Sequence, residues 1–123
     1  MHTLDTNTII YYLEGEHGVG DFLEELLAQN SATYISVMTE LELFSHALLT
    51  ADDMHTIERI ISSLTIIPLD SRVARTAAAL RRQHHIKSAD SAIAATALLT
   101  GTTLVTRNIS DFKTIPGLKL FEI

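Results

Sequence analysis

The amino-acid sequence predicts an α/β fold, a three-layer α/β/α sandwich with a mainly parallel five-stranded sheet. Short apolar segments of about four residues alternate with helical patterns of about ten residues or more, which is typical of parallel strands joined by helices. The 123 residues contain no internal repeat and no linker, since the two prolines and five glycines are scattered singly. With 46% hydrophobic residues, we expect a single domain over residues 1–123 with one buried core.

The individual elements follow from local patterns. Strands are predicted at residues 2–4, 33–36, 65–69, 102–106 and 118–123. Helices are predicted at residues 6–13, 19–27, 37–49, 52–64 with Asp52 as the cap, 71–84 and 89–100, followed by a helical turn at 111–115. Pro68 places the third strand at a sheet edge or strand end, because proline cannot donate a ladder hydrogen bond.

Two helices carry acidic side chains in apolar surroundings. The apolar stripe of the helix at 37–49 is expected to comprise Val37, Leu41, Phe44 and Leu48. At about 100° per residue, Glu40 lies at the rim of that stripe and Glu42 on the opposite side. The helix at 89–100 is nearly all apolar, so we expect it to be buried, with Asp90 in its first turn.

Composition excludes several classes of function. The chain has no cysteine, which removes disulfide scaffolds, thiol nucleophiles and thiolate zinc sites. The sequence predicts no secretory leader and no membrane span of about 20 apolar residues, so we expect a cytoplasmic protein. The net charge of −6 is uneven, because residues 1–70 carry most of the acids and residues 71–110 most of the bases. This asymmetry suits a basic surface beside an acidic pocket.

Four carboxylates stand out by position. Asp5 follows the first strand and Asp111 follows the strand that ends at Thr106, and ligands of parallel sheets bind beyond the carboxyl ends of the strands. Glu40 and Asp90 come from the two helices described above. Each acid also has a structural interpretation, namely a helix cap for Asp5 and Asp111, an ion pair for Glu40 and a helix-dipole contact for Asp90.

The same positions carry a family resemblance. In order, they are LDTN at 4–7, SVMTEL at 36–41, DSAIAATA at 90–97 and TRNISDF at 106–112. Together these motifs resemble the PIN-domain family and, within it, the VapC-type toxins of toxin-antitoxin modules, which are small ribonucleases. One departure is visible, because many relatives have a proline just before the third acid and this chain has Lys87-Ser88-Ala89.

The resemblance implies a catalytic and metal-binding set of four acids. They are Asp5, Glu40 and Asp90 as core ligands and Asp111 as a more variable fourth. Thr6 and Thr106 match hydroxyl positions beside the site, and Asn7 and Asn108 match supporting polar positions.

The chemistry explains this ligand set, because Mg²⁺ and Mn²⁺ prefer carboxylate oxygens and can activate water against a phosphodiester. The resemblance therefore implies a Mg²⁺- or Mn²⁺-dependent endoribonuclease. The candidate RNA-binding residues are Arg72, Arg75, Arg81, Arg82, Lys87 and Arg107.

The resemblance also implies two protein partners, a small antitoxin and a second copy of the chain in a homodimer. The expected groove for an antitoxin helix is formed by Tyr11, Tyr12, Phe22, Leu23 and Leu26. The alternative is that these side chains belong to the core. The acidic excess of residues 1–70 would complement a basic antitoxin tail.

Three other interpretations remain at this point. A receiver-like phosphotransfer domain would need a late lysine after the strand at 102–106, and a dehalogenase-like phosphatase would need an aspartate where Asn7 stands. A PIN-like module that binds RNA or protein without catalysis is the third. The adjacent His84 and His85 point about 100° apart on a helix, so they are interpreted as surface residues rather than zinc ligands.

Overall fold

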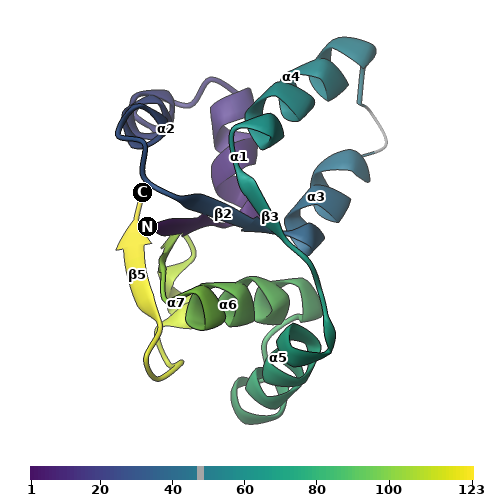
Figure 1. Ribbon diagram of the computed structural model, residues 1–123, viewed down its shortest axis with the longest axis vertical. Helices are drawn as coiled ribbons and strands as arrows, with labels where there is room; N and C mark the ends of the chain where they lie inside the picture. Colours follow the sequence, from purple (N-terminus) through teal and green to yellow (C-terminus); the bar gives the residue numbers. More distant parts are fainter. Residues whose placement is uncertain (47–48) are drawn as a thin grey trace.

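The computed structural model describes residues 1–46 and 49–123, and within them the predicted sandwich is confirmed (Figure 1). The strands are β1 (His2–Leu4), β2 (Thr33–Ser36), β3 (Thr65–Ile67), β4 (Thr103–Thr106) and β5 (Lys119–Glu122). They form one five-stranded sheet in the order β3-β2-β1-β4-β5, and every pairing is parallel. The strand that contains the proline-terminated segment, β3, lies at a sheet edge as predicted.

Helices cover both faces of the sheet (Figure 1). One layer comprises α1 (Thr6–Leu13), α2 (Val19–Ala28), α3 (Val37–Phe44) and α4 (Ala51–Ser62). The other comprises α5 (Ser71–His84), α6 (Ser88–Thr100) and α7 (Ile109–Phe112). Each layer has its own apolar cluster against the sheet, which is the arrangement that buries both faces of a parallel sheet.

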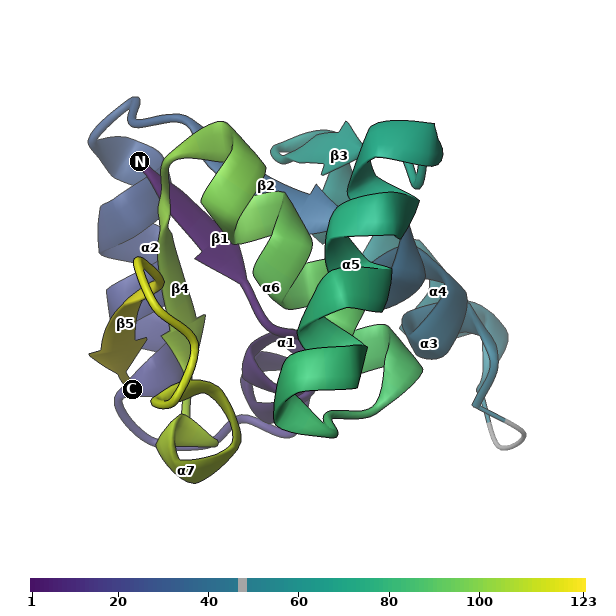
Figure 2. The same ribbon diagram turned by 90° about the horizontal axis from the view of Figure 1, so that it is seen from below.

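Helix α6 is the buried helix that its composition predicts. A continuous run from Ser91 to Ala97 is buried, and α5 packs alongside it (Figure 2). Gly101 ends the helix in the left-handed conformation at φ 65°, where glycine avoids the penalty of a β-carbon.

Several predicted boundaries are wrong. Helix α3 ends at Phe44 rather than at 49, and the predicted stripe residue Leu48 lies outside the described residues. The cap of α4 is Thr50, in a capping box with Asp53, rather than Asp52. The last helical turn is α7, which begins two residues earlier than predicted, at Ile109.

The predicted orientation of α3 is also wrong. Its buried residues are Thr39 and Leu43, whereas Leu41 is 58% exposed and Phe44 37% exposed. The prediction assumed that the apolar side chains of a helix face the core, and here the threonine faces it instead. The hydroxyls of Thr6 in α1 and Thr39 lie 3.0 Å apart, a contact that holds this side of α3 inward.

The aromatic groove predicted for an antitoxin is contradicted in part, because its alternative, a core position, holds for two of its five members. Leu23 and Leu26 are buried in the cluster beneath α1 and α2. Phe22 stacks on Phe121 of β5 with ring centroids 5.0 Å apart. Tyr11 lies under the guanidinium of Arg107. Among the described residues, no helix has the length and apolarity needed to cross a membrane.

Candidate functional site

The candidate site lies where β1 and β4 end side by side. Asp5 follows β1 directly and is only 4% exposed. Its carboxylate accepts a hydrogen bond of 2.8 Å from the hydroxyl of Thr106, the last residue of β4. Asp5 occupies the N-cap position of α1, but within the described residues its side chain makes no cap hydrogen bond.

Burial is the main reason why the pKa of Asp5 is raised above its ordinary value. The hydroxyl of Thr106 and the backbone N–H groups of Thr6 and Asn7 act in the opposite direction, because they stabilise the carboxylate. The negative charge of Glu42 raises the pKa of Asp5 further. Asp5 is thus a buried acid with hydrogen-bond donors on one side and a like charge on the other.

Asp90 enters the same site from the first turn of α6. Its pKa is raised to about 6, first by burial and then by the charges of Asp5, Asp111 and Glu42. The positive charge of Lys87 partly offsets this rise. Figure 2 shows why these segments meet, since the carboxyl ends of β1 and β4, the beginning of α6 and helix α7 all lie at one end of the sheet.

Glu42, which the sequence argument placed on the far side of its helix, belongs to this acidic group. Its carboxylate accepts a hydrogen bond of 2.7 Å from the Thr6 hydroxyl, directly after Asp5. Among the described residues, the charges that raise the pKa values of Asp5 and Asp90 include Glu42 and do not include Glu40. Glu42 lies three positions after Thr39, so a prediction that took Thr39 as buried would have found it.

Of the four predicted supporting residues, Thr6, Thr106 and Asn108 contact the acids, whereas the side chain of Asn7 is exposed. Asn108 donates to the carboxylate of Asp111 at 2.6 Å, and its backbone N–H donates to the Thr106 hydroxyl at 3.0 Å. A chain of contacts therefore connects Asp111 through Asn108 and Thr106 to Asp5. This arrangement orients two of the acids relative to each other across the end of β4.

The donor set suits a hard divalent cation, although the acids do not form a closed cage. Among the described residues, no three carboxylate, imidazole or thiol groups lie close enough to surround one ion. Mg²⁺ keeps several waters and is usually held by one or two carboxylates plus substrate phosphates. Asp5 and Asp90 fit this mode, since like charges with raised pKa values gain most from a neutralising cation.

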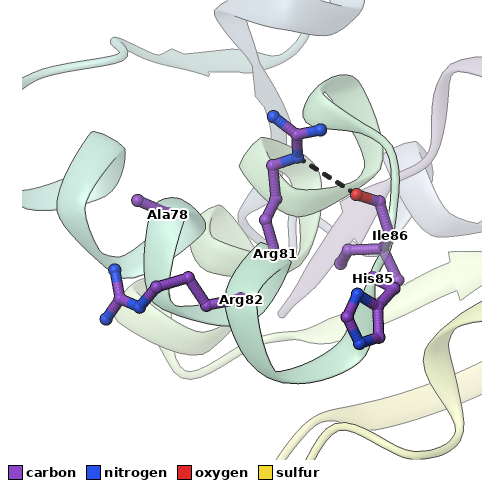
Figure 3. A pocket seen from close by; sticks show the side chains of 5 residues that line it. All are labelled: Ala78, Arg81, Arg82, His85 and Ile86. Atoms are coloured by element: carbon purple, nitrogen blue, oxygen red, sulfur yellow. Dashed lines mark hydrogen bonds between the residues drawn. The ribbon is translucent and has the colours of Figure 1, made fainter.

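The predicted RNA-binding residues differ in their surroundings. Arg107 forms an ion pair with Glu16 and donates through Nε to the carbonyl of Ile123. Arg81 donates through Nε to the carbonyl of Ile86 at 3.2 Å, and Arg82 extends from the neighbouring position (Figure 3). Lys87 is the predicted base whose charge acts directly on Asp90.

Comparison with known proteins identifies the fold. The family model of the PIN domain matches residues 3–118. The chain belongs to the PIN-domain family. A search of the curated proteins finds no match.

Solved structures place the PIN domain described here beside toxin-antitoxin proteins. It is similar to a chain of a toxin-antitoxin complex from Klebsiella pneumoniae, with 31% identity, a TM-score of 0.82 and complete coverage of both chains. A chain of VapBC2 from Rickettsia felis, bound to a promoter DNA fragment, has 29% identity and a TM-score of 0.85, with 99% and 98% of the two chains covered. A chain of DNA-bound VapBC from Salmonella typhimurium has 26% identity and a TM-score of 0.85, with 98% and 96% covered. The resemblance to VapC-type PIN toxins is confirmed.

Proposed function

We propose that this PIN domain is a Mg²⁺- or Mn²⁺-dependent endoribonuclease that acts in the cytoplasm as the toxin of a toxin-antitoxin module. The observation that carries the proposal is the group of like charges at the carboxyl edge of the sheet, in which burial and neighbouring acids raise the pKa values of Asp5 and Asp90. A stable fold gains nothing from such repulsion, whereas a cation-binding site needs it.

The proposed roles divide between the buried Asp5, the half-buried Asp90 and their neighbours. Asp5 and Asp90 would hold the cation, which when bound activates water and neutralises charge at phosphorus. Thr106 orients Asp5 through its hydroxyl, and Asn108 orients Asp111 through its amide. Asp111 lies at the rim, where it favours the cation electrostatically whether or not it contacts it.

For the remaining acid we propose Glu42, with Glu40 as the alternative that the sequence motif suggested. Glu42 accepts a hydrogen bond from the hydroxyl of Thr6, the residue next to Asp5, and its charge acts on both Asp5 and Asp90. The two glutamates lie on the same helix and carry the same charge, so each is a matched control for the other.

The test is cleavage of RNA by the purified protein, with and without Mg²⁺ or Mn²⁺. Asp5→Asn should abolish cleavage, because it removes a charge at nearly constant volume. Glu42→Gln should lower the rate at least about a hundredfold, on the scale of the several kcal/mol that a metal supplies. Glu40→Gln should leave cleavage near the wild-type rate. The opposite result for the two glutamates would restore Glu40 as the ligand.

An inactive binding module is the second candidate function. It would bind RNA or a protein while neither Mg²⁺ nor Mn²⁺ produced cleavage. Mapping the cut positions on total cellular RNA would separate the two functions and would define the target sequence at the same time. Absence of cleavage at every metal concentration, by correctly folded protein, would refute the nuclease proposal.

For the antitoxin we propose a different groove from the predicted one. A cavity of about 230 Å³ lies between α1, α3 and α4. Apolar side chains form most of it, and acidic side chains lie at its rim: Ile10, Leu13, Leu43, Leu49 and Ile57, with Glu14, Glu42 and Asp53. An amphipathic helix with basic residues fits this pattern. A base that reached Glu42 would compete with the cation at the active site.

Expression in a bacterial host tests the toxin assignment. The wild-type chain alone should arrest growth, and Asp90→Asn should relieve the arrest. We also propose a homodimer, in which the exposed Leu41 and Phe44 of α3 supply apolar surface. Harmless expression of active enzyme would contradict the toxin role, and a monomer in light scattering would contradict the dimer.

A further inference from the structure

A hollow of about 390 Å³ adjoins the acidic site on the face of the sheet that α5, α6 and α7 cover. One wall carries His84, His85 and Lys87, and the other carries Ser110, Asp111 and Thr114. The hydroxyl of Thr114 and Nδ1 of His84 lie 3.4 Å apart and connect the two walls. Asp111 lines the hollow and also raises the pKa of Asp90, so the hollow opens directly beside the acids.

A second hollow, of about 500 Å³, continues along the end of α5. It is lined by Ala78, Arg81 and Arg82, and it shares His85 and Ile86 with the first (Figure 3). The two hollows therefore meet at the turn between α5 and α6. Together they form a path with basic side chains that leads away from the acidic edge.

The backbone at this turn is unusual. His85 ends α5 in the left-handed conformation, with φ 56° and ψ 33°. Gly101 occupies the same position at the end of α6, and glycine is the residue that this position favours. A β-carbon there costs roughly 1 kcal/mol. Strained residues cluster at ligand sites and switch regions, and the His85 side chain lines both hollows.

We propose that the hollow lined by His84, His85 and Lys87 binds the RNA phosphate adjacent to the scissile one, and that the strand continues past His85 towards Arg82. This inference rests on the nuclease function proposed above. Of the predicted RNA-binding residues, it selects Lys87 and Arg82 and assigns Arg107 to its contacts with Glu16 and Tyr11.

The chemistry of the hollow fits a phosphodiester. The Lys87 ammonium group, the His85 imidazole and the Ser110 hydroxyl are donors suited to phosphate oxygens, whereas the Asp111 carboxylate on the same hollow is not. The volume lies within the range of about 300 to 1,000 Å³ typical of ligand sites. An RNA strand approaching a group of acids also needs cations beside it, and Lys87 supplies one next to Asp90.

The hollow differs from the antitoxin groove proposed above in both place and charge. That groove lies in the layer formed by α1, α3 and α4 and has an acidic rim, whereas this hollow is lined by residues of α5 and α7, which belong to the opposite layer. A basic antitoxin segment would be repelled by Lys87 and the neighbouring arginines, whereas RNA would be attracted.

Two variants test the inference. His85→Gly places the favoured residue at the left-handed position, so its thermal midpoint should equal or exceed that of the wild type. Lys87→Gln removes one charge from the hollow. The control is Lys119→Gln, an exposed lysine on β5 that pairs with Thr103 at the amino end of β4, at the opposite end of the sheet.

The measurement is fluorescence anisotropy with a labelled pool of short single-stranded RNA of randomised sequence, without divalent metal. Lys87→Gln should weaken binding about tenfold and reduce the salt slope by about 0.7, the value for one phosphate contact on a single strand. His85→Gly should weaken binding about threefold and raise KM for cleavage rather than lower kcat. Lys119→Gln should bind like the wild type.

The outcomes separate this inference from the proposed function. If wild-type protein cleaves RNA while all three variants bind and cleave alike, the hollow is not an RNA subsite and the nuclease assignment stands. If wild-type protein neither binds nor cleaves RNA, both proposals fall. A fall in kcat without a change in KM for His85→Gly would also overturn the subsite.

Discussion

The two ends of the parallel sheet carry different polar groups, neutral hydroxyls at the amino end and carboxylates at the carboxyl end. At the amino end, buried threonines form a neutral chain: Thr3 and Thr102 hydroxyls lie 2.6 Å apart, Thr102 and Thr100 lie 3.0 Å apart, and Thr100 donates to the carbonyl of Thr96 at 2.7 Å. When Thr3 donates to Thr102, Thr102 to Thr100 and Thr100 to the carbonyl of Thr96, every hydroxyl in this network has a partner. At the carboxyl end, Glu42 acts as a like charge on Asp5, and Asp5, Asp111 and Glu42 act as like charges on Asp90.

The difference predicts that the amino end serves stability and that the carboxyl end serves the proposed function. A satisfied neutral network in a buried region stabilises the fold, because no polar group is left without a partner. Clustered acids destabilise the fold and are useful only when a cation or substrate arrives. The amino end should therefore lose stability when altered, and the carboxyl end should gain it.

The largest expected effect is on catalysis by Asp90→Asn. Cleavage should fall at least about a hundredfold, because the site loses a cation-binding charge. The same change removes repulsion within the acidic group, so the thermal midpoint without metal should rise. Activity and unfolding assays on one preparation would check both signs. A variant that lost activity and stability together would show that Asp90 is structural.

The next effect concerns the amino end. Thr102→Val leaves the hydroxyls of Thr3 and Thr100 without this partner, which should lower the free energy of unfolding by about 1 to 3 kcal/mol. The double variant with Thr3→Val should recover part of the loss, because it removes the unpaired group as well. Urea unfolding would measure the change, and RNA cleavage should stay at the wild-type rate. A loss of cleavage by the folded variant would show that the two ends are coupled.

The sequence predicts the position of the three aspartates at the carboxyl edge of the sheet better than that of Glu42. Asp5 and Asp111 were found because acids placed after parallel strands meet at one edge, and Asp90 because a lone acid interrupts a buried helix. Glu42 was missed for a physical reason. Threonine is mostly exposed in proteins, so Thr39 gave no sign of facing the core, while Leu41 and Phe44 suggested a core face that the structure exposes.

The turn between α5 and α6, which carries His84, His85 and Lys87, could not be predicted from the sequence for a related reason. Adjacent histidines on an ideal helix diverge, but His85 leaves the helix in a left-handed conformation. That departure brings His84, His85 and Lys87 to one hollow. The geometry of an ideal helix therefore does not predict this turn.

A smaller effect should follow from metal binding. A cation that binds only the folded state stabilises it by about 1.4 kcal/mol at ten times its dissociation constant. Thermal unfolding should therefore shift upward with Mg²⁺ or Mn²⁺ for the wild type and for Thr102→Val, since the amino end takes no part. Asp90→Asn should show little shift. Equal shifts in all three proteins would place the cation elsewhere on the chain.

The smallest expected effect is the pH dependence of stability without metal. The pKa of Asp90 is about 6 in the folded protein and 3.8 as its ordinary value, so the folded state binds the proton more tightly than the unfolded state. As the pH falls from 7 through 6 towards 4, this carboxyl should therefore raise the free energy of unfolding. Because Asp90 is only half-buried, solvent screening reduces the expected gain to about 1 kcal/mol.

Other groups also change charge between pH 7 and pH 4, so their contribution to stability must be removed by comparing variants. His2 acts oppositely, because burial lowers its pKa and its protonation on acidification disfavours the folded state. The informative quantity is therefore the difference in unfolding free energy between wild type and Asp90→Asn, in which the His2 contribution cancels. That difference should shrink between pH 7 and pH 5, whereas the difference between wild type and Thr102→Val should stay constant. Parallel pH profiles for wild type and Asp90→Asn would mean that Asp90 carries no unfavourable charge, and the contrast between the two ends of the sheet would fail.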